Sequence, residues 1–142
     1  MTDALQGGCL CGALRYRLDG APANVIDAGY CHCRLCQRSS GAPVLAWLTL
    51  AFDALRYTRG APAVFRSSTH SQREFCAICG TQIAFRRISA PRTVDVTLAS
   101  LDDPSTVSPQ YHIWYRSRLP WLEIADPFPR HEDAGPDAHD VC

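Results

Sequence analysis

Apolar and polar residues alternate along several short segments of the chain. Residues 13–18 and 93–100 show this alternation, which has the period of a half-buried strand because successive side chains point to opposite faces. Residues 44–50 form an apolar run broken only by Thr49, short enough for a central strand that is buried on both faces. Further short strands are expected at residues 24–30, 72–75 and 82–86. The pattern therefore predicts a chain built mostly from short strands.

Two more segments, residues 52–58 and 63–68, flank the turn sequence Arg59-Gly60-Ala61-Pro62 and predict a β-hairpin. No repeat or linker divides residues 1–125, which are interpreted as a single domain. From Asp126 onward Pro, Asp and His dominate and apolar residues become sparse. Residues 126–142 are therefore expected to form a disordered tail.

The chain has 142 residues, enough for one domain with its own hydrophobic core. Its 14 Lys+Arg and 14 Asp+Glu residues give a formal net charge of zero. No global field therefore favours nucleic acid or a membrane surface as a partner. The longest apolar stretch, residues 42–52, is interrupted and too short to span a bilayer. Residues 1–8 lack the basic and apolar regions of an export signal, which favours a cytoplasmic location.

Eight cysteines add candidate chemistry to this picture, because seven of them lie in tight clusters. In a reducing compartment such clusters indicate metal ligation rather than disulfide bonds. The clusters are a Cys-x-Cys at Cys9 and Cys11, a triplet at Cys31, Cys33 and Cys36, and a Cys-x-x-Cys at Cys76 and Cys79.

The clustered cysteines divide most naturally into a group of four and a group of three. Two pairs from distant strand turns, Cys9 with Cys11 and Cys76 with Cys79, would close a tetrahedral four-sulfur zinc site with a structural role. The triplet would leave a second zinc one protein ligand short, which is typical of a metal that does chemistry. Joining the triplet to one pair would leave the other pair without a partner, so this alternative is less favoured.

Other polar residues near the clusters carry less specific signals. His32 is interpreted as a solvent-facing residue or a partner of a metal ligand, although it could itself be a ligand. His112 lies among aromatic residues and either packs or lines a pocket. Arg34 and Arg38 either offset the charge of three thiolates, hold a substrate carboxylate, or are simply solvated. Plain surface or tail residues are expected at His70, His131, His139 and Cys142.

Three cysteine-containing segments follow one another along the chain: Gly8-Cys9-Leu10-Cys11-Gly12, then Cys31-His32-Cys33-Arg34-Leu35-Cys36 with Ser39-Ser40-Gly41-Ala42-Pro43, then Phe75-Cys76-Ala77-Ile78-Cys79-Gly80-Thr81. In this order they resemble the glutathione-dependent formaldehyde-activating enzyme family, which also includes centromere protein V. Residues 101–104, 112–114 and 120–121 are similar to the C-terminal half of that family. The resemblance spans residues 8–122.

The resemblance implies a mainly β fold of packed antiparallel sheets with zinc-knuckle turns, shared with a zinc-binding exchange-factor-like superfamily. It implies that residues 1–125 form one zinc-binding domain with two zinc ions, a structural ion on Cys9, Cys11, Cys76 and Cys79 and a catalytic ion on Cys31, Cys33 and Cys36. The implied activity is carbon–sulfur lyase chemistry that joins formaldehyde to the thiol of glutathione. The expected partners are therefore a small thiol and an aldehyde.

A different class of function is also compatible with these residues. In a non-catalytic, zinc-stabilised module that binds a protein or peptide, a fourth ligand such as His32 or His112 would close the triplet's zinc site. Nucleic-acid binding through zinc knuckles would require a basic face, which the zero net charge disfavours. The accessibility of the triplet's zinc therefore separates an enzyme from a binding module.

Overall fold

The strands form two sheets in the computed structural model, which describes residues 4–89 and 91–135. The smaller sheet has the order β1-β2-β5 and consists of β1 (Ala4–Gly8), β2 (Arg15–Asp19) and β5 (Leu55–Arg59). The larger sheet has seven strands, in the order β10 (His112–Ile113), β3 (Asp27–Cys31), β4 (Leu45–Ala51), β9 (Thr93–Thr97), β8 (Gln82–Arg87), β7 (Ser71–Phe75) and β6 (Ala63–Arg66). Only the β10–β3 pair of these sheets is parallel. The expected mainly β fold of antiparallel sheets is confirmed.

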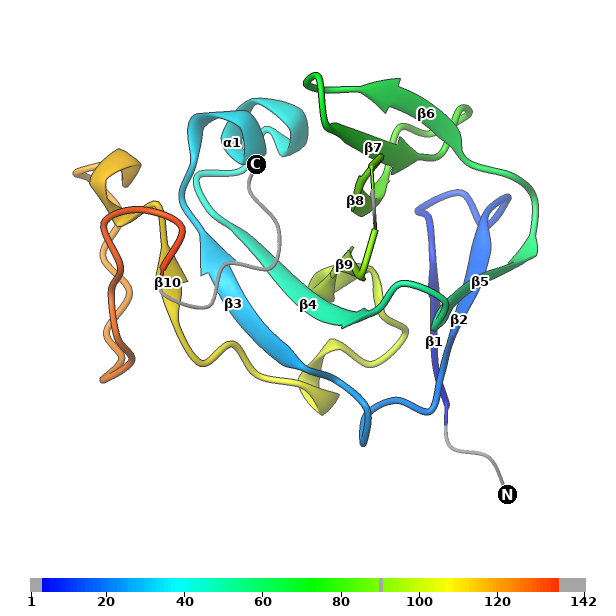
Figure 1. Ribbon diagram of the computed structural model, residues 1–142, viewed down its shortest axis with the longest axis horizontal. Coiled ribbons are helices and arrows are strands. Elements are labelled where there is room, and N and C mark those ends of the chain that lie inside the picture. The colour runs from blue at the N-terminus through cyan, green and yellow to red at the C-terminus, as the bar shows by residue number, and fades with distance from the viewer. Residues whose placement is uncertain (1–3, 90, 136–142) are drawn as a thin grey trace.

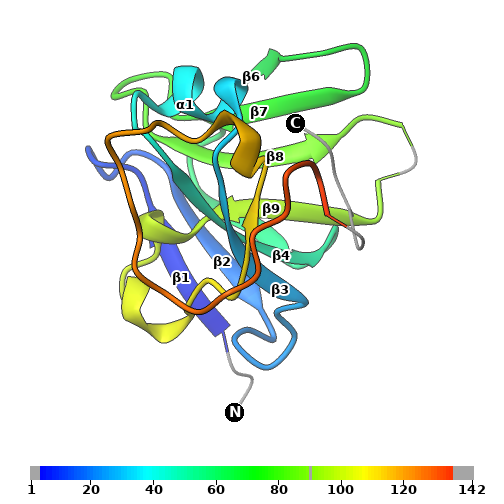
Figure 2. The same ribbon diagram turned by 90° about the vertical axis from the view of Figure 1, so that its left-hand side faces the viewer.

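Helices are few and short in the described part of the chain. They are α1 (Arg34–Ser40) and the 3-10 helices η1 (Leu98–Ser100), η2 (Pro104–Thr106) and η3 (Tyr115–Ser117). None of the described helices has the length and apolar character that crossing a bilayer requires. Helix α1 lies at the same end of the molecule as β6 and β7 (Figure 2).

The hydrophobic core lies between the two sheets, which stand beside one another in Figure 1. The alternation predicted at residues 13–18 and 93–100 corresponds to β2 and β9, and it directs alternate side chains inward. Leu18 of β2, Leu48 of β4 and Val96 of β9 are fully buried in this core. The apolar run at residues 44–50 is β4, which pairs with β3 on one side and with β9 on the other. The central strand is therefore where the sequence predicts it.

The hairpin expected from residues 52–58 and 63–68 does not form. Strand β5 pairs with β2 in the smaller sheet, whereas β6 pairs with β7 at the edge of the larger sheet. The two strands differ in burial, because Leu55 is buried opposite Leu18 while Phe65 is exposed. Gly60, with φ +72°, lies close to the Ala13 carbonyl where the chain leaves β5 for the other sheet. The segment predicted to be a hairpin turn, residues 59–62, instead carries the chain from the smaller sheet to the larger one.

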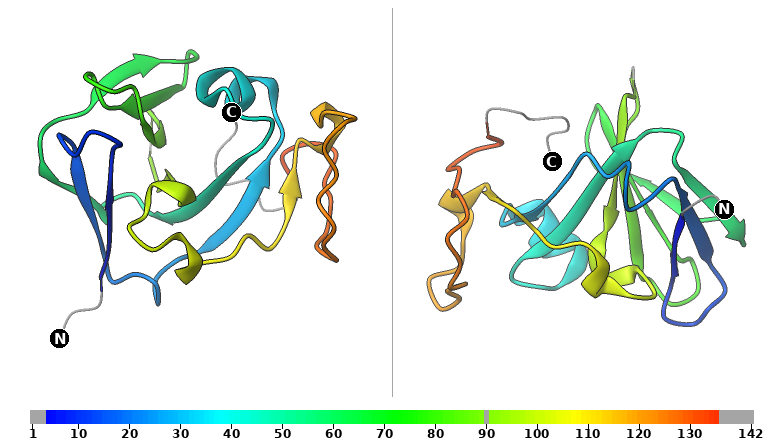
Figure 3. Two further views of the ribbon diagram at one scale, coloured as in Figure 1. Left: turned by 180° about the vertical axis from the view of Figure 1, so that it is seen from behind. Right: turned by 90° about the horizontal axis from the view of Figure 1, so that it is seen from below.

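The disordered tail expected from Asp126 onward is also wrong for residues 126–135. The backbone N–H of His112 donates to the Pro129 carbonyl, and the N–H of His131 donates to the His112 carbonyl. The edge of β10 thus supplies hydrogen bonds that this proline-rich segment cannot make within itself. Figure 3 shows the segment beside β10, on the far side from β4. The remainder of the expected tail, with His139 and Cys142, lies outside the described residues.

We predict that Leu48→Ala lowers the free energy of unfolding by about 2–5 kcal/mol, because the side chain is 0% exposed and its loss leaves a cavity between the sheets. Urea denaturation measures the change. Val64→Ala, at a side chain 55% exposed on the edge strand β6, serves as the control. Its effect should stay within about 0.5 kcal/mol. Equal losses for the two variants would contradict the assignment of the core.

Candidate metal centres

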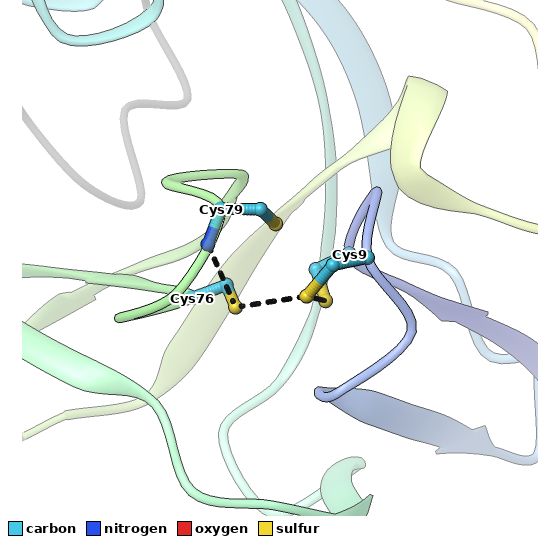
Figure 4. A group of neighbouring side chains, drawn as sticks. Cys9, Cys76 and Cys79 are labelled. Atoms are coloured by element: carbon cyan, nitrogen blue, oxygen red, sulfur yellow. Dashed lines mark hydrogen bonds between the residues drawn. The ribbon is translucent and has the colours of Figure 1, made fainter.

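Four cysteine sulfurs meet between two strand-connecting turns. Cys9 and Cys11 come from the turn after β1, and Cys76 and Cys79 come from the turn after β7 (Figure 4). All four sulfurs lie within 4.8 Å of one another. The Cys9–Cys11 and Cys11–Cys76 sulfur distances are 3.6 and 3.8 Å, so the thiols are close without being disulfide-bonded. Sulfurs bound tetrahedrally to zinc at about 2.3 Å would be about 3.8 Å apart, so the group fits a zinc ion.

The local backbone directs N–H groups at these sulfurs. The N–H of Leu14 donates to Cys9 Sγ at 3.2 Å, and the N–H of Ile78 donates to Cys76 Sγ at 3.4 Å. Gly12 and Gly80 adopt the left-handed conformation, with φ of 80° and 81°, and this conformation lets each turn curl around its sulfurs. Both turns therefore have the zinc-knuckle form that the sequence predicts.

The pKa values of these thiols also favour a cation at the site. A hydrogen bond from the Thr81 side chain is the largest of several effects that lower the pKa of Cys79 to about 5. A backbone hydrogen bond from Ala13 is the largest single effect on Cys11 and lowers its pKa, but partial desolvation and the neighbouring cysteines together raise that pKa to about 11. Close thiolates repel one another, so the group ionises completely only when a positive charge binds among them.

The second group of sulfurs is the triplet, which lies where β3 passes into α1. Cys31 ends β3, Cys33 is the N-cap of α1, and Cys36 lies in the first turn of the helix. Within the short helix α1, the Cys36 N–H donates to Cys33 Sγ at 3.2 Å. The three sulfurs lie within 4.8 Å of one another, and all three side chains are buried. The structure therefore brings the cysteines together as the predicted groups of four and three.

No histidine, aspartate or glutamate of the described residues joins the triplet as a fourth ligand. Trp47 and Phe85 pack against the three cysteines within one buried cluster, and Leu45, Ile113 and Trp114 lie at its margin. Three mutually close sulfurs fit a tetrahedral zinc with one position left over. The arrangement can therefore hold a metal whose ligands from the described residues leave one coordination position unfilled.

The two histidines considered as fourth ligands bond to each other instead. His32 Nε2 lies 2.9 Å from His112 Nδ1, and His112 Nε2 lies 2.8 Å from an Asp126 carboxylate oxygen. His112 therefore packs, with both ring nitrogens in use. His32 is buried rather than solvent-facing, and burial is the main cause that lowers its pKa to about 4. Both rings help to anchor residues 126–131 beside the triplet.

A buried arginine near the triplet was not singled out by the sequence pattern. Arg73 Nη2 lies 3.7 Å from Cys36 Sγ, and its Nη1 donates to Ser39 Oγ at 3.2 Å. Arg34 and Arg38, the cations that the sequence places beside the triplet, are both exposed on α1. No local signal identifies Arg73, because 37 positions separate it from Cys36.

Trp114 was also missed as a candidate for chemistry. Its backbone adopts the left-handed conformation with φ 54°, which is rare for a residue with a large side chain. Its indole Nε1 is buried without a hydrogen-bond partner among the described residues. The side chain packs against the cluster that contains the triplet. Backbone strain and an unpaired donor at one residue are features that concentrate at functional sites.

Residues 4–117 match the sequence model of a family described as glutathione-dependent formaldehyde-activating enzyme. A crystal structure of a Rhodobacter sphaeroides protein is similar to this chain, with a TM-score of 0.52 and 24% sequence identity. The similarity covers 88% of this chain and 98% of that chain. At this identity the structural likeness supports the fold alone.

We predict that Asp126→Ala lowers the free energy of unfolding by about 1–3 kcal/mol, because the buried His112 loses the acceptor of its ring N–H. Urea denaturation measures the loss. Glu123→Ala removes an exposed carboxylate just before the segment 126–131 and should leave the stability unchanged. If both variants were as stable as the parent protein, the segment would not be anchored through His112.

Proposed function

This chain belongs to the glutathione-dependent formaldehyde-activating enzyme family, and on that premise we propose that it is a zinc-dependent enzyme that adds a thiol to a small aldehyde. Glutathione and formaldehyde are the substrates that the family name suggests. The observation that carries the proposal is the triplet, whose three buried sulfurs have no fourth ligand among the described residues. An enzyme needs such an open position, whereas a purely structural zinc does not.

The two cysteine groups have different roles in this proposal. Cys9, Cys11, Cys76 and Cys79 fill a tetrahedral shell and hold a structural zinc that fastens the smaller sheet to the β7–β8 turn. Cys31, Cys33 and Cys36 hold the catalytic zinc. Reduced thiols are required at both sites, which suits a reducing compartment such as the cytosol.

In the net reaction a carbon–sulfur bond forms, the carbonyl π bond breaks, and the thiol proton ends on the former carbonyl oxygen. A zinc ion on the triplet would lower the pKa of a thiol that reaches its open position. The aromatic rings of Trp47 and Phe85, which pack against the triplet, keep bulk water away from the cysteines. A low-polarity wall strengthens the electrostatic interactions within the site.

The chain also offers a donor for the charge that develops on the aldehyde oxygen. As sulfur attacks the carbonyl carbon, the oxygen becomes negative and needs a hydrogen-bond donor. The indole N–H of Trp114 is buried, has no partner among the described residues, and belongs to a side chain that packs against the triplet cluster. We assign it this role.

We predict that Cys33→Ser reduces the zinc content from two ions per chain to one and brings hemithioacetal formation down to the spontaneous rate. The reason is that two sulfurs hold the ion more weakly than three. Elemental analysis gives the zinc content, and the adduct between glutathione and formaldehyde is followed by NMR. The paired variant Cys76→Ser should instead unfold the protein, because a structural zinc site contributes about 10–16 kcal/mol.

A Cys33→Ser protein that keeps two zinc ions and full activity would exclude the triplet as the catalytic site. A zinc-loaded parent protein that adds nothing to the spontaneous rate, with any of several thiols, would favour the zinc-stabilised binding module instead.

We predict that Trp114→Phe lowers kcat by about 10²-fold, the usual cost of removing one donor to a developing oxyanion. The substitution keeps an aromatic ring against the triplet and removes the N–H. Steady-state kinetics with zinc-loaded protein measures the effect. Trp121→Phe, at an indole 70% exposed, is the matched control and should match the parent protein. An unchanged kcat in Trp114→Phe would remove the indole from the reaction.

A further inference from the structure

We propose that Arg73 is the positive counter-charge of the cysteine triplet and acts on the bound metal through Cys36. It is a positioning residue rather than a catalytic one, because it contacts a ligand sulfur. The inference rests on the part of the proposed function that places a metal on the triplet, and not on the identity of the substrates.

The side chain of Arg73 is fixed from three sides. Strand β7 pairs with β8 so that Arg73 lies opposite Phe85, and the guanidinium stands over that ring at 5.2 Å from its centroid. One guanidinium nitrogen lies 3.7 Å from Cys36 Sγ, and the other donates to Ser39 Oγ at 3.2 Å. Ser39 in turn donates to the Cys36 carbonyl. The positive charge is thus aimed at one sulfur of the triplet.

The burial of Arg73 makes an anionic partner necessary. Only 5% of the residue is exposed, and a buried guanidinium is costly unless a negative charge compensates it. No carboxylate among the described residues forms an ion pair with Arg73. The largely buried Arg86 on β8 shows the contrast, since it pairs with Glu74 at 2.6 Å. Among the described residues, the sulfur of Cys36 lies within hydrogen-bond reach of the guanidinium and, as a thiolate, would balance its charge.

The net charge of the metal centre determines how readily its open position accepts an anionic ligand. A Zn²⁺ ion with three thiolates carries one net negative charge, which discourages a fourth anionic ligand. The guanidinium of Arg73 cancels that charge and withdraws electron density from Cys36 through its hydrogen bond. The site with Arg73 therefore accepts a thiolate more readily than the same site without it. Arg73 tunes the triplet toward a thiol substrate.

The exposed cations on α1 cannot take this role. Arg34 bonds to the Gln37 side chain, and Arg38 lies in the last turn of the helix. Both are exposed, so water screens their charges. Arg38 therefore provides a control in which one positive charge is removed close to the triplet in sequence.

The test compares Arg73→Gln, Arg73→Lys and Arg38→Gln by two measurements that do not depend on catalysis. Competition with a chromophoric chelator gives the affinity of each variant for its weaker zinc. Cobalt substitution gives a sulfur-to-metal absorption band. The change in this band as 2-mercaptoethanol is added measures how tightly each variant binds the thiol. We expect Arg73→Gln to weaken zinc at the triplet by about 10–100-fold and to weaken mercaptoethanol binding in parallel. Arg73→Lys should restore part of the zinc affinity and part of the mercaptoethanol affinity. Arg38→Gln should match the parent protein in both affinities.

Unchanged affinities in a folded Arg73→Gln protein would overturn the inference, and so would an equal loss in Arg38→Gln. If Arg73→Gln does not fold, Arg73→Lys decides. If Arg73→Lys binds zinc at the triplet with an affinity within about tenfold of the parent value, the positive charge has the proposed role. If Arg73→Lys loses that zinc while the four-cysteine site stays loaded, the proposed role is refuted. A parent protein that binds only one zinc would reject both this inference and the proposed function. Two zinc ions without any effect of Arg73 would reject this inference alone.

Discussion

At the junction of the two sheets, sulfurs converge from turns 65 positions apart, as those of Cys11 and Cys76 do. One turn belongs to the three-stranded sheet and the other to the seven-stranded sheet, so a metal bound between them would cross-link the two layers of the core. A zinc site of this kind contributes about 10–16 kcal/mol, as much as the whole stability of an ordinary domain. With such a cross-link, a sheet of only three strands would need less buried surface to stay attached to the larger sheet.

Strand β7 links this cross-link to the proposed reaction site. It carries Arg73, which contacts Cys36 of the triplet, and it runs directly into Cys76 of the four-cysteine group. Under the proposed function, a structural ion that fixes Cys76 would therefore also fix the strand that directs the guanidinium at the triplet. The two cysteine groups are separate in their sulfurs but share one rigid element. Metal binding at the four-cysteine group would then help to keep Arg73 in place beside Cys36 of the triplet.

The sequence could predict those features that depend on local spacing. The knuckle turns and the alternating strands β2 and β9 follow from residues close together in the chain. The division of the cysteines into four and three joins turns 65 positions apart, but it follows from counting ligands, because two pairs of thiolates fill a tetrahedral site. The failures concern pairing at a distance: β5 joins β2 instead of β6, and residues 129–133 bond to the edge of β10. Arg73 belongs with these, because only the pairing of β7 with β8 carries it to the triplet. The helix that follows Cys33 turns the nearby Arg34 outward to solvent.

Coordination number, rather than exposure to solvent, separates the two cysteine groups. The four-cysteine group lies near the surface, beside Leu10 and Ile78, which are 89% and 77% exposed. A metal there would still be closed to ligands, because four sulfurs complete a tetrahedron. The triplet is buried among aromatic rings, yet a metal held by its three sulfurs would keep one position that no His, Asp or Glu of residues 4–89 and 91–135 fills. In the proposed reaction, burial would strengthen the attraction between an entering thiolate and the guanidinium of Arg73, because little water is present to screen the two charges.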